Sequence, residues 1–256
     1  KVRAWKGFFN LHQSHARPFE RMMTGLFRGQ EAEVLRNLKK AMGSDQSAAA
    51  KAQRAALNPD FVLFSREEAE RIFAEAADPA FRDMLTAGMR KAFEEMGSDA
   101  EPVIGDRLSK WLNLSKEKFS FEVNDTTLAS LKSELTIGLK EAESLAQITQ
   151  RVKNVFGFAE DYRAQRIAIT EATGTLNNGI LAAYRLGGED DYKFWLTTRQ
   201  SNVRDSHQAT DGQERAFDEP FQTGAGNALM YPGDKDCADL ADIISCYCTM
   251  LRKKKE

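Results

Sequence analysis

The feature that most constrains the fold is the spacing of apolar residues, which follows a helical period through most of the chain. Between Phe19 and Met42 apolar side chains recur every three or four residues, as on one face of an amphipathic helix. The same spacing marks residues 65–76, 79–96, 125–139, 144–157 and 161–186. Residues 101–123 have a mixed pattern, which predicts a short helix and an extended piece. Together these segments predict a body of packed helices.

Local signals predict where some of these helices begin. Ser65 with Glu68, and Ser144 with Gln147, have the form of capping boxes, in which the first side chain binds a backbone amide three residues on. Pro79 predicts the start of a new helix, because proline is favoured in a first helical turn and disrupts a helix interior.

After residue 188 the chain becomes rich in Gly, Asp, Asn and Pro. Residues 192–198 are aromatic and β-branched and predict a strand. Shorter strands or turns are predicted at 216–217, 228–231 and 245–251. The fold class is therefore α+β and predominantly α. We expect a helical assembly or partner-binding region (residues 1–157), followed by a small mixed α/β domain with a long helix and short strands (residues 158–256).

Composition excludes some classes of protein. The chain is 42% hydrophobic and 29% charged, which is enough apolar residue to form a core and is not typical of disorder. No apolar stretch approaches the roughly 18 residues of a membrane span, and no secretory signal is recognisable. The sequence starts at Lys1 rather than at a methionine, so we expect it to be part of a longer chain.

Basic residues are concentrated near the N-terminus. Residues 1–54 contain eleven Lys and Arg against four Asp and Glu, a net charge of +7, whereas the region after Gly157 is acidic up to its last few residues. A basic segment of this kind suits double-stranded DNA or an acidic protein surface, and it also suits a solvated helix face. The candidate contacts with DNA or a partner are Arg28, Arg36, Lys39 and Lys40. The overall pI of about 6.1 argues against nucleic-acid binding as the main function.

The three cysteines all lie near the C-terminus, at Cys237, Cys246 and Cys248. An odd number is a poor disulfide framework and favours a reducing cytoplasm. In a strand, Cys246 and Cys248 would face the same side, and with His207 they provide ligand types of a tetrahedral zinc site, to which Cys237 could add a fourth. The alternative is that the cysteines are small buried apolar residues and that His207 bonds to a carbonyl.

An enzyme is the competing class. His207 could act as a general base oriented by Asp205 or Asp211, and a bound metal could activate water. The sequence contains no nucleophile motif, no Gly-rich phosphate loop and no metalloprotease helix motif. We therefore expect a protein that is not an enzyme.

An ordered set of motifs in the last third of the chain carries a family resemblance. The segments are residues 194–198, 203–207, 211–213, 217–221, 229–234 and 246–249, preceded by a helix at 163–171. In this order they resemble the C-terminal domain of phage Mu F-like minor head proteins, the phage head-morphogenesis family. The motif residues are Arg204, Asp205, His207, Asp211, Gly212, Tyr231, Pro232, Gly233 and Asp234. The chain departs from the family pattern at Ser245 and Tyr247, which replace Asn and Arg, and at Ile169, which stands where Arg is usual.

The resemblance implies a structural minor capsid protein of a tailed bacteriophage or prophage. Such a protein would act in head morphogenesis and DNA handling, including ejection, at the portal vertex or the inner capsid surface. Its partners would be portal, capsid or scaffolding protein, and double-stranded DNA. It would reside in the virion, and in the host cytoplasm during assembly. The alternative is a metal-dependent enzyme or toxin-associated domain that uses His207, Cys246 and Cys248.

Overall fold

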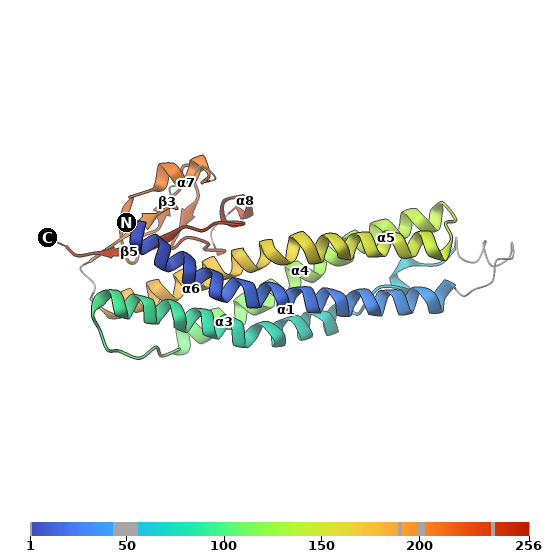
Figure 1. Ribbon diagram of the computed structural model, residues 1–256, viewed down its shortest axis with the longest axis horizontal. Helices are drawn as coiled ribbons and strands as arrows, with labels where there is room; N and C mark the ends of the chain where they lie inside the picture. The colour runs from blue at the N-terminus through green and yellow to red at the C-terminus, as the bar shows by residue number, and fades with distance from the viewer. Residues whose placement is uncertain (1, 43–55, 189–190, 199–202, 237–238, 256) are drawn as a thin grey trace. The chain divides into compact units, whose positions relative to one another are not determined.

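The computed structural model is predominantly helical, with a few short antiparallel strands near the C-terminus, which confirms the predicted fold class (Figure 1). The structure describes residues 2–42, 56–188, 191–198, 203–236 and 239–255. The main helices are α1 (Val2–Met42), α3 (Arg66–Met96), α4 (Asp106–Lys140), α5 (Leu145–Phe158) and α6 (Ala164–Leu186). A 3-10 turn, η1 (Pro59–Phe61), precedes α3, and a π-helical turn, η2 (Ala159–Arg163), joins α5 to α6.

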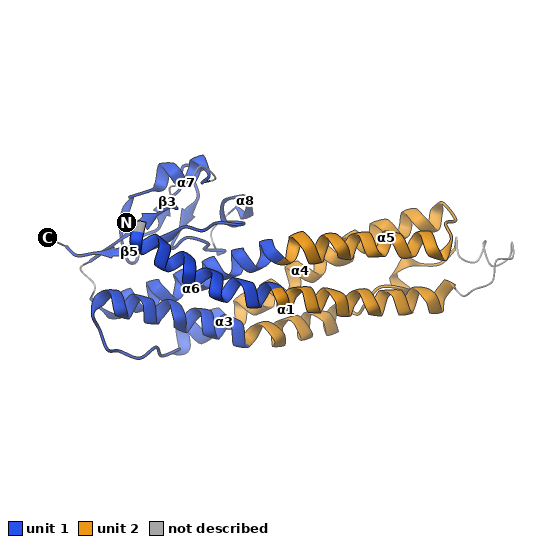
Figure 2. Cartoon of the chain, viewed as in Figure 1, with its two compact units in different colours: residues 1–20, 79–112, 165–256 blue, residues 21–78, 113–164 orange. Residues whose placement is uncertain are grey.

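The chain forms two compact units, coloured separately in Figure 2. Unit 1 contains residues 1–20, 79–112 and 165–256, and unit 2 contains residues 21–78 and 113–164. Helices α1, α3 and α4 contribute residues to both units, so this division does not fall at one position of the chain. The division at residue 157 stays a prediction about sequence segments.

Two prolines lie inside helices where the sequence predicted helix starts. Pro18 is within α1 and Pro79 is within α3, so α1 begins at Val2 and α3 is a single helix. A proline removes one backbone hydrogen bond of a helix, a loss that side-chain burial on either side can offset. Phe19 and Phe81, each next to or near a proline, are almost fully buried, and their rings meet edge to face at 5.8 Å.

The extended piece predicted within residues 101–123 is wrong, because α4 runs without interruption from Asp106. The mixed pattern of these residues includes Phe119 and Phe121, which alternate as in a strand. Phe119 is buried and Phe121 is half exposed, because positions two residues apart lie on different faces of a helix. The buried positions Leu112, Phe119, Val123, Leu131, Leu135 and Leu139 follow a helical period through the whole element.

The capping boxes predicted from the sequence are largely present. At α5 both reciprocal bonds form, because Ser144 Oγ accepts from the Gln147 amide and the Gln147 side chain accepts from the Ser144 amide. Before α3 the Glu68 amide donates to Ser65 Oγ at 3.4 Å. Helix α6 ends at Leu186, where the helical spacing of residues 161–186 also ends.

Unit 2 has an aromatic core. The ring of Phe73 lies 6.0 Å from that of Phe27 and 6.4 Å from that of Phe119, which joins residues of α1, α3 and α4. A buried polar pair accompanies these rings, in which Gln30 Nε2 donates to Asn124 Oδ1 at 2.6 Å. The core therefore depends on contacts between segments far apart in the sequence.

Unit 1 adds small sheets to its helices. Strand β1 (Tyr192–Leu196) is central between β2 (Glu214–Ala216) and β5 (Thr249–Lys253), and both pairings are antiparallel. In the register of β1 and β5, Leu196 pairs with Thr249. A second sheet pairs β3 (Phe221–Gln222) with β4 (Ala228–Leu229), and the short helices α7 (Asp205–Thr210) and α8 (Leu240–Ile243) complete this part of the chain.

Helix α6 is buried along most of its length and crosses α3 at very short range within unit 1. Gly179 lies against the backbone carbonyl of Leu85, and Gly88 lies against that of Leu176. A Cβ atom at either glycine would overlap the facing carbonyl. This reciprocal pair therefore allows two helix backbones to approach more closely than any larger residue permits.

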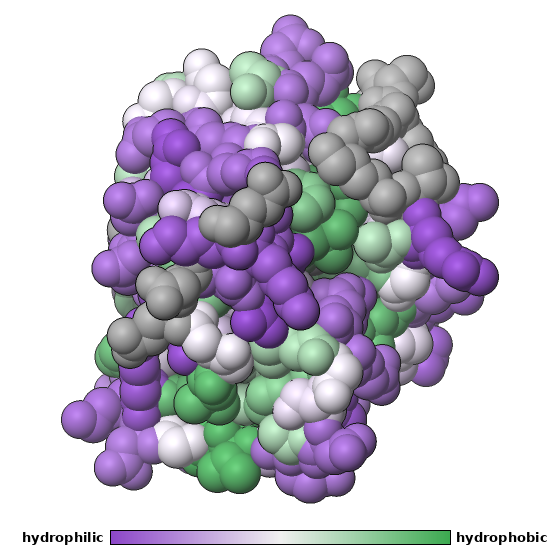
Figure 3. Space-filling model, turned by 90° about the vertical axis from the view of Figure 1, so that its left-hand side faces the viewer, coloured by the Kyte–Doolittle hydropathy of each residue, from purple (hydrophilic) through white to green (hydrophobic). Residues whose placement is uncertain are grey.

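The face of unit 1 seen in Figure 3 is mainly hydrophilic, with apolar residues in separate small patches. Leu186 and Val103 are exposed apolar residues of this unit, with 71% and 68% of their surface accessible. None of the described helices combines the length and apolar character that a bilayer-spanning segment requires.

We expect Gly179→Ala to destabilise the protein by about 1–3 kcal/mol, because the added methyl group would force α3 and α6 apart. Gly25→Ala is the matched control, since Gly25 is an exposed position inside α1 with open space around it. The control should stabilise the protein by about 0.5–1 kcal/mol through the higher helix propensity of alanine. Urea unfolding measures both changes, and equal effects of the two substitutions would contradict the close crossing.

Candidate functional site

A buried cluster of one histidine and two cysteines is the chemically distinctive site of the described chain. His207 lies on α7, while Cys246 and Cys248 lie in the loop between α8 and β5. His207 Nδ1 is 3.5 Å from the Sγ atoms of both cysteines, and the three ligand atoms lie within 4.8 Å of one another. All three side chains are at most 3% exposed. The structure thus brings together three residues that the sequence suggested as metal ligands.

The fourth suggested ligand, Cys237, lies outside the described residues. The two cysteines of the cluster precede β5, although the sequence placed them in a strand. The expected alternation nevertheless holds, because both sulfur atoms face His207 and the intervening Tyr247 ring lies against Phe9 and His12 of α1, at 5.7 and 5.0 Å.

Polar side chains on one face of α6 hold the backbone of the cysteine loop. Thr170 Oγ1 accepts from the Ser245 amide at 3.1 Å, and Thr173 Oγ1 donates to the Cys246 carbonyl. Asn177 Nδ2 donates to the Cys248 carbonyl at 3.0 Å. These residues are three and four positions apart and so share one helix face. They fix the main chain of the loop and leave both sulfur atoms facing His207.

A carboxylate that the sequence did not suggest faces the other nitrogen of His207. Asp242 Oδ1, on α8, is 3.3 Å from His207 Nε2, although the geometry falls short of a hydrogen bond. Asp242 is itself held by Ser206 Oγ at 2.9 Å and by Asn227 Nδ2 at 3.1 Å. Burial raises the pKa of Asp242, but these hydrogen bonds and one from Thr223 outweigh it, so the pKa lies below its ordinary value. Asp242 therefore stays ionised beside His207.

Aromatic rings line the cluster on another side. The rings of Trp195 and His207 meet edge to face with centres 5.2 Å apart, and Phe221 packs on Trp195 at 5.3 Å. Trp195 is fully buried. These rings exclude water from the cluster and strengthen the electrostatic interactions within it.

The two thiols of the cluster differ in acidity. The hydrogen bond from Cys248, together with His207, holds the pKa of Cys246 well below the usual thiol range. The same pairing with Cys246, and burial, hold the pKa of Cys248 well above it. Burial lowers the pKa of His207, but the hydrogen bond to Cys246 and the charges of Cys246 and Asp242 outweigh it and leave that pKa raised. Such a set can bind a soft divalent metal, or form a thiolate–imidazolium pair.

The two acidic residues suggested as partners of His207 lie elsewhere. Asp211 Oδ1 accepts from the amide and hydroxyl of Thr197, at 2.8 and 3.1 Å, and so ties α7 to the end of β1. Asp205 is exposed in the first turn of α7, where a negative charge is favoured by the helix dipole. Asp242 occupies the position against His207 instead, and only long-range packing could have revealed it.

The other motif residues shape the backbone. Tyr231–Asp234 form a tight turn with proline second, Gly233 third at a φ of +83°, and a hydrogen bond from the Asp234 amide to the Tyr231 carbonyl. Proline followed by glycine is typical of such turns. Gly233 packs against Gly174 of α6, where a Cβ would meet the Gly174 amide nitrogen at 2.7 Å. Asp234 accepts from the amides of Met230 and Asp236, which fixes the residues on both sides.

Gly212 and Arg204 flank the histidine helix. Gly212 has a φ of +82°, which favours glycine, and its amide donates to the Trp195 carbonyl at 2.9 Å. Arg204 precedes α7 and donates to the Ile244 carbonyl, which joins the histidine helix to the cysteine loop. Both residues therefore position the cluster without entering it.

A buried lysine of unit 1 also went unnoticed in the sequence. Lys193 on β1 is fully buried, and its Nζ donates to the Met230 carbonyl at 2.9 Å and the Phe217 carbonyl at 3.3 Å. The Nζ also lies 5.1 Å above the ring of Phe221. Burial, and then the nearby Arg185, lower the pKa of Lys193 from 10.5 to about 7. The sequence pattern does not predict this burial, because lysine is almost never fully buried unless it is paired.

The suggested DNA or partner contacts lie on the part of α1 in unit 2. Arg28, Arg36, Lys39 and Lys40 are all exposed. Arg28 pairs with Glu160 at 2.8 Å. Lys39 and Lys40 lie in the last turn of α1, where positive charge is favoured by the helix dipole. A structural role at the helix end therefore accounts for part of this basic group.

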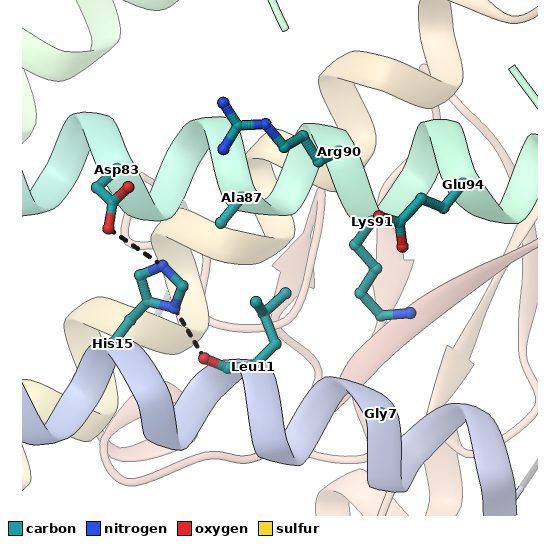
Figure 4. Close-up of a pocket in the computed structure, with 8 residues that line it drawn as sticks. All are labelled: Gly7, Leu11, His15, Asp83, Ala87, Arg90, Lys91 and Glu94. Atoms are coloured by element: carbon teal, nitrogen blue, oxygen red, sulfur yellow. Dashed lines mark hydrogen bonds and ion pairs between the residues drawn. The ribbon is translucent and has the colours of Figure 1, made fainter. Parts of the chain in front are cut away.

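A groove of about 440 Å³ lies between α1 and α3 in unit 1 (Figure 4). His15 projects into it, with its two ring nitrogens 2.8 Å from the Leu11 carbonyl and 3.3 Å from Asp83. Its other polar lining includes Lys91, which pairs with Glu95. Local partners thus account for His15, Asp83 and Lys91, and the buried cluster remains the stronger candidate site.

Comparison with known proteins finds a family model that matches the C-terminal part of the chain. Residues 129–251 match the model of a family described as Phage Mu protein F like protein. The match contains α6, the turn at residues 231–234 and all three residues of the buried cluster. No solved structure matches the chain at a significant level.

One similar curated protein is named NAD(+)--arginine ADP-ribosyltransferase EFV, from Enterococcus faecalis (strain ATCC 700802 / V583). It is 30% identical over 154 residues, which are 59% of this chain and 29% of that protein. The chain thus spans less than a third of the length of this relative, and most of the relative lies outside the similarity.

We expect the stability of the protein to depend on Lys193 between pH 7 and 10.5. In this window the unfolded chain holds a proton on the lysine that the folded chain does not, so the free energy of unfolding rises with pH. Lys193→Met should remove this contribution, up to about 1.4 kcal/mol per pH unit. Urea unfolding of both proteins at pH 7.5 and 9.5 measures the difference. An identical pH dependence would show that Lys193 keeps its ordinary pKa.

Proposed function

We propose, from the match of residues 129–251 to the model of the Phage Mu protein F-like family, that the chain is a minor head protein of a tailed phage or prophage. It acts in head morphogenesis, at the portal vertex or the inner capsid surface. The observation that carries this proposal is the family match, which contains the motif segments from residue 163 to 249 in order.

The structural roles of the motif residues support a protein that is not an enzyme. Gly212, Gly233 and Asp234 lie in turns. Arg204 and Asp211 form hydrogen bonds between elements. His207 and the two cysteines are buried, so a substrate has no direct access to them in this conformation. A domain built in this way is suited to carrying binding surfaces in an assembly.

We further propose that the exposed basic residues of α1 contact packaged double-stranded DNA or an acidic portal, capsid or scaffolding surface. Arg36, Lys39 and Lys40 are exposed on one segment of a long helix. Contacts of lysine and arginine with phosphates are independent of base sequence and sensitive to salt. Such contacts suit a protein that meets DNA inside a particle without reading it.

The alternative function is a metal-dependent enzyme or toxin-associated domain that uses His207, Cys246 and Cys248. The similarity to the Enterococcus faecalis ADP-ribosyltransferase supports this alternative. That similarity covers 29% of the relative, so the activity in its name need not belong to the matched segment. The burial of the cluster argues for the head protein over this alternative.

We expect the protein to be present in assembled particles. Quantitative mass spectrometry of purified procapsids and virions should find a few to tens of copies per particle, co-purifying with portal protein. In a phage that lacks the gene, supplying the chain from a second copy should restore particle formation. The supplied protein should then be incorporated into the particles. Absence from both procapsids and virions would overturn the proposal and favour the enzymatic or toxin-associated alternative.

We expect the triple variant Arg36→Glu, Lys39→Glu, Lys40→Glu to bind double-stranded DNA more weakly. The slope of log affinity against log salt should become shallower by roughly 0.9 for each phosphate that the variant no longer neutralises. The control is Lys110→Glu, Lys140→Glu, Lys153→Glu, which makes the same charge change at exposed residues outside α1. Fluorescence anisotropy with a duplex at several salt concentrations measures both. Equal weakening in the two variants would show a general charge effect and contradict a contact at α1.

A further inference from the structure

The geometry of the buried cluster has the dimensions of a metal site. With zinc–sulfur bonds of about 2.3 Å and zinc–nitrogen bonds of about 2.1 Å at a tetrahedral angle, the nitrogen and sulfur atoms are separated by about 3.6 Å. His207 Nδ1 is 3.5 Å from Cys246 Sγ and 3.5 Å from Cys248 Sγ. Both nitrogen–sulfur distances therefore agree with a single ion bound by the three atoms.

With a neutral imidazole, hydrogen bonding alone does not explain this arrangement. Asp242 faces Nε2, so the proton of the neutral imidazole belongs on Nε2 and the lone pair of Nδ1 points at both sulfur atoms. One lone pair cannot accept a full hydrogen bond from two thiols at once. A cation at this point accepts the lone pair and one electron pair from each thiolate, so every group is satisfied.

We propose that His207 Nδ1 and the thiolates of Cys246 and Cys248 are three ligands of a zinc ion in this domain. The two sulfur atoms and the imidazole are ligand types that select zinc over magnesium or calcium. The ion links α7 to the loop between α8 and β5, two segments that are well separated in the sequence.

The surroundings of the cluster contain the secondary contacts that zinc sites use. A carboxylate commonly accepts from the second nitrogen of a zinc-bound histidine and orients the ring, which is the position of Asp242. The Cys248 amide donates to Cys246 Sγ at 3.3 Å, which stabilises a thiolate. Ser206 and Asn227 hold Asp242 in turn. The three ligand side chains are thus surrounded by groups that orient them.

This proposal does not rest on the head-protein function, and metal content tests it directly. The full chain is produced in zinc-supplemented medium, dialysed, and analysed by inductively coupled plasma mass spectrometry. We expect about one zinc per chain in the unaltered protein and in the control His15→Asn, whose histidine lies outside the cluster. His207→Asn and the double variant Cys246→Ser, Cys248→Ser should contain far less.

Cobalt(II) provides a second readout that identifies the ligands. Added to the metal-free chain, it should produce a visible spectrum of tetrahedral type and a near-ultraviolet thiolate-to-cobalt band, which Cys248→Ser weakens and His15→Asn does not. Asp242→Asn is a positioning variant that keeps both thiols. It should bind one zinc with about 10–100-fold lower affinity in competition with a chelator.

An unaltered protein that contains no zinc and forms no thiolate-to-cobalt band would overturn the proposal. Full zinc content in the double cysteine variant would overturn it as well, because the metal would then lie elsewhere. If the cysteine variants fail to fold, the spectrum of the unaltered chain and the affinity of Asp242→Asn still decide the question. A zinc-free protein whose stability does not change when a chelator is added, and whose Cys246 is reactive, would identify a thiolate–imidazolium pair instead.

Discussion

The burial of α6 is the constraint on which unit 1 depends. A helix buried on nearly all sides needs either an apolar surface or polar groups with partners, because an unpaired polar group in the interior is costly. Two solutions occur on α6. Glycines allow α3 and the turn at Gly233 to approach its backbone, and the hydroxyls and amide of Thr170, Thr173 and Asn177 bind the main chain of the cysteine loop.

This arrangement separates two tasks within the cysteine loop. Main-chain groups of the loop are bound by α6, so the loop does not need its side chains to hold its conformation. The sulfur atoms of Cys246 and Cys248 are left to face His207, and Asp242 and Trp195 complete the surroundings. The cluster is consequently positioned by the surrounding main-chain contacts, as a selective metal site requires.

Local patterns in the sequence were sufficient for the features that depend on local chemistry. The capping box at Ser144, the end of α6 and the turn at residues 231–234 all follow from a few adjacent residues. The continuity of α1 through Pro18 and of α3 through Pro79 does not follow from adjacent residues, because burial against distant partners overrides a local helix-breaking signal. The ligand types His207, Cys246 and Cys248 were also visible, whereas Asp242 was not, since no spacing rule relates α8 to α7.

The departure at Tyr247 has a physical explanation in the same loop. Alternation along Cys246, Tyr247 and Cys248 directs the central ring away from the cluster and toward α1, where it lies against Phe9 and His12. Burial lowers the pKa of His12 to about 4, so this histidine is neutral at physiological pH and packs as an aromatic ring. A tyrosine ring suits that apolar environment better than the guanidinium usual in the family, whose charge would lose hydration there. The side chain at this position therefore packs on the N-terminal helix, while the residues on either side face His207.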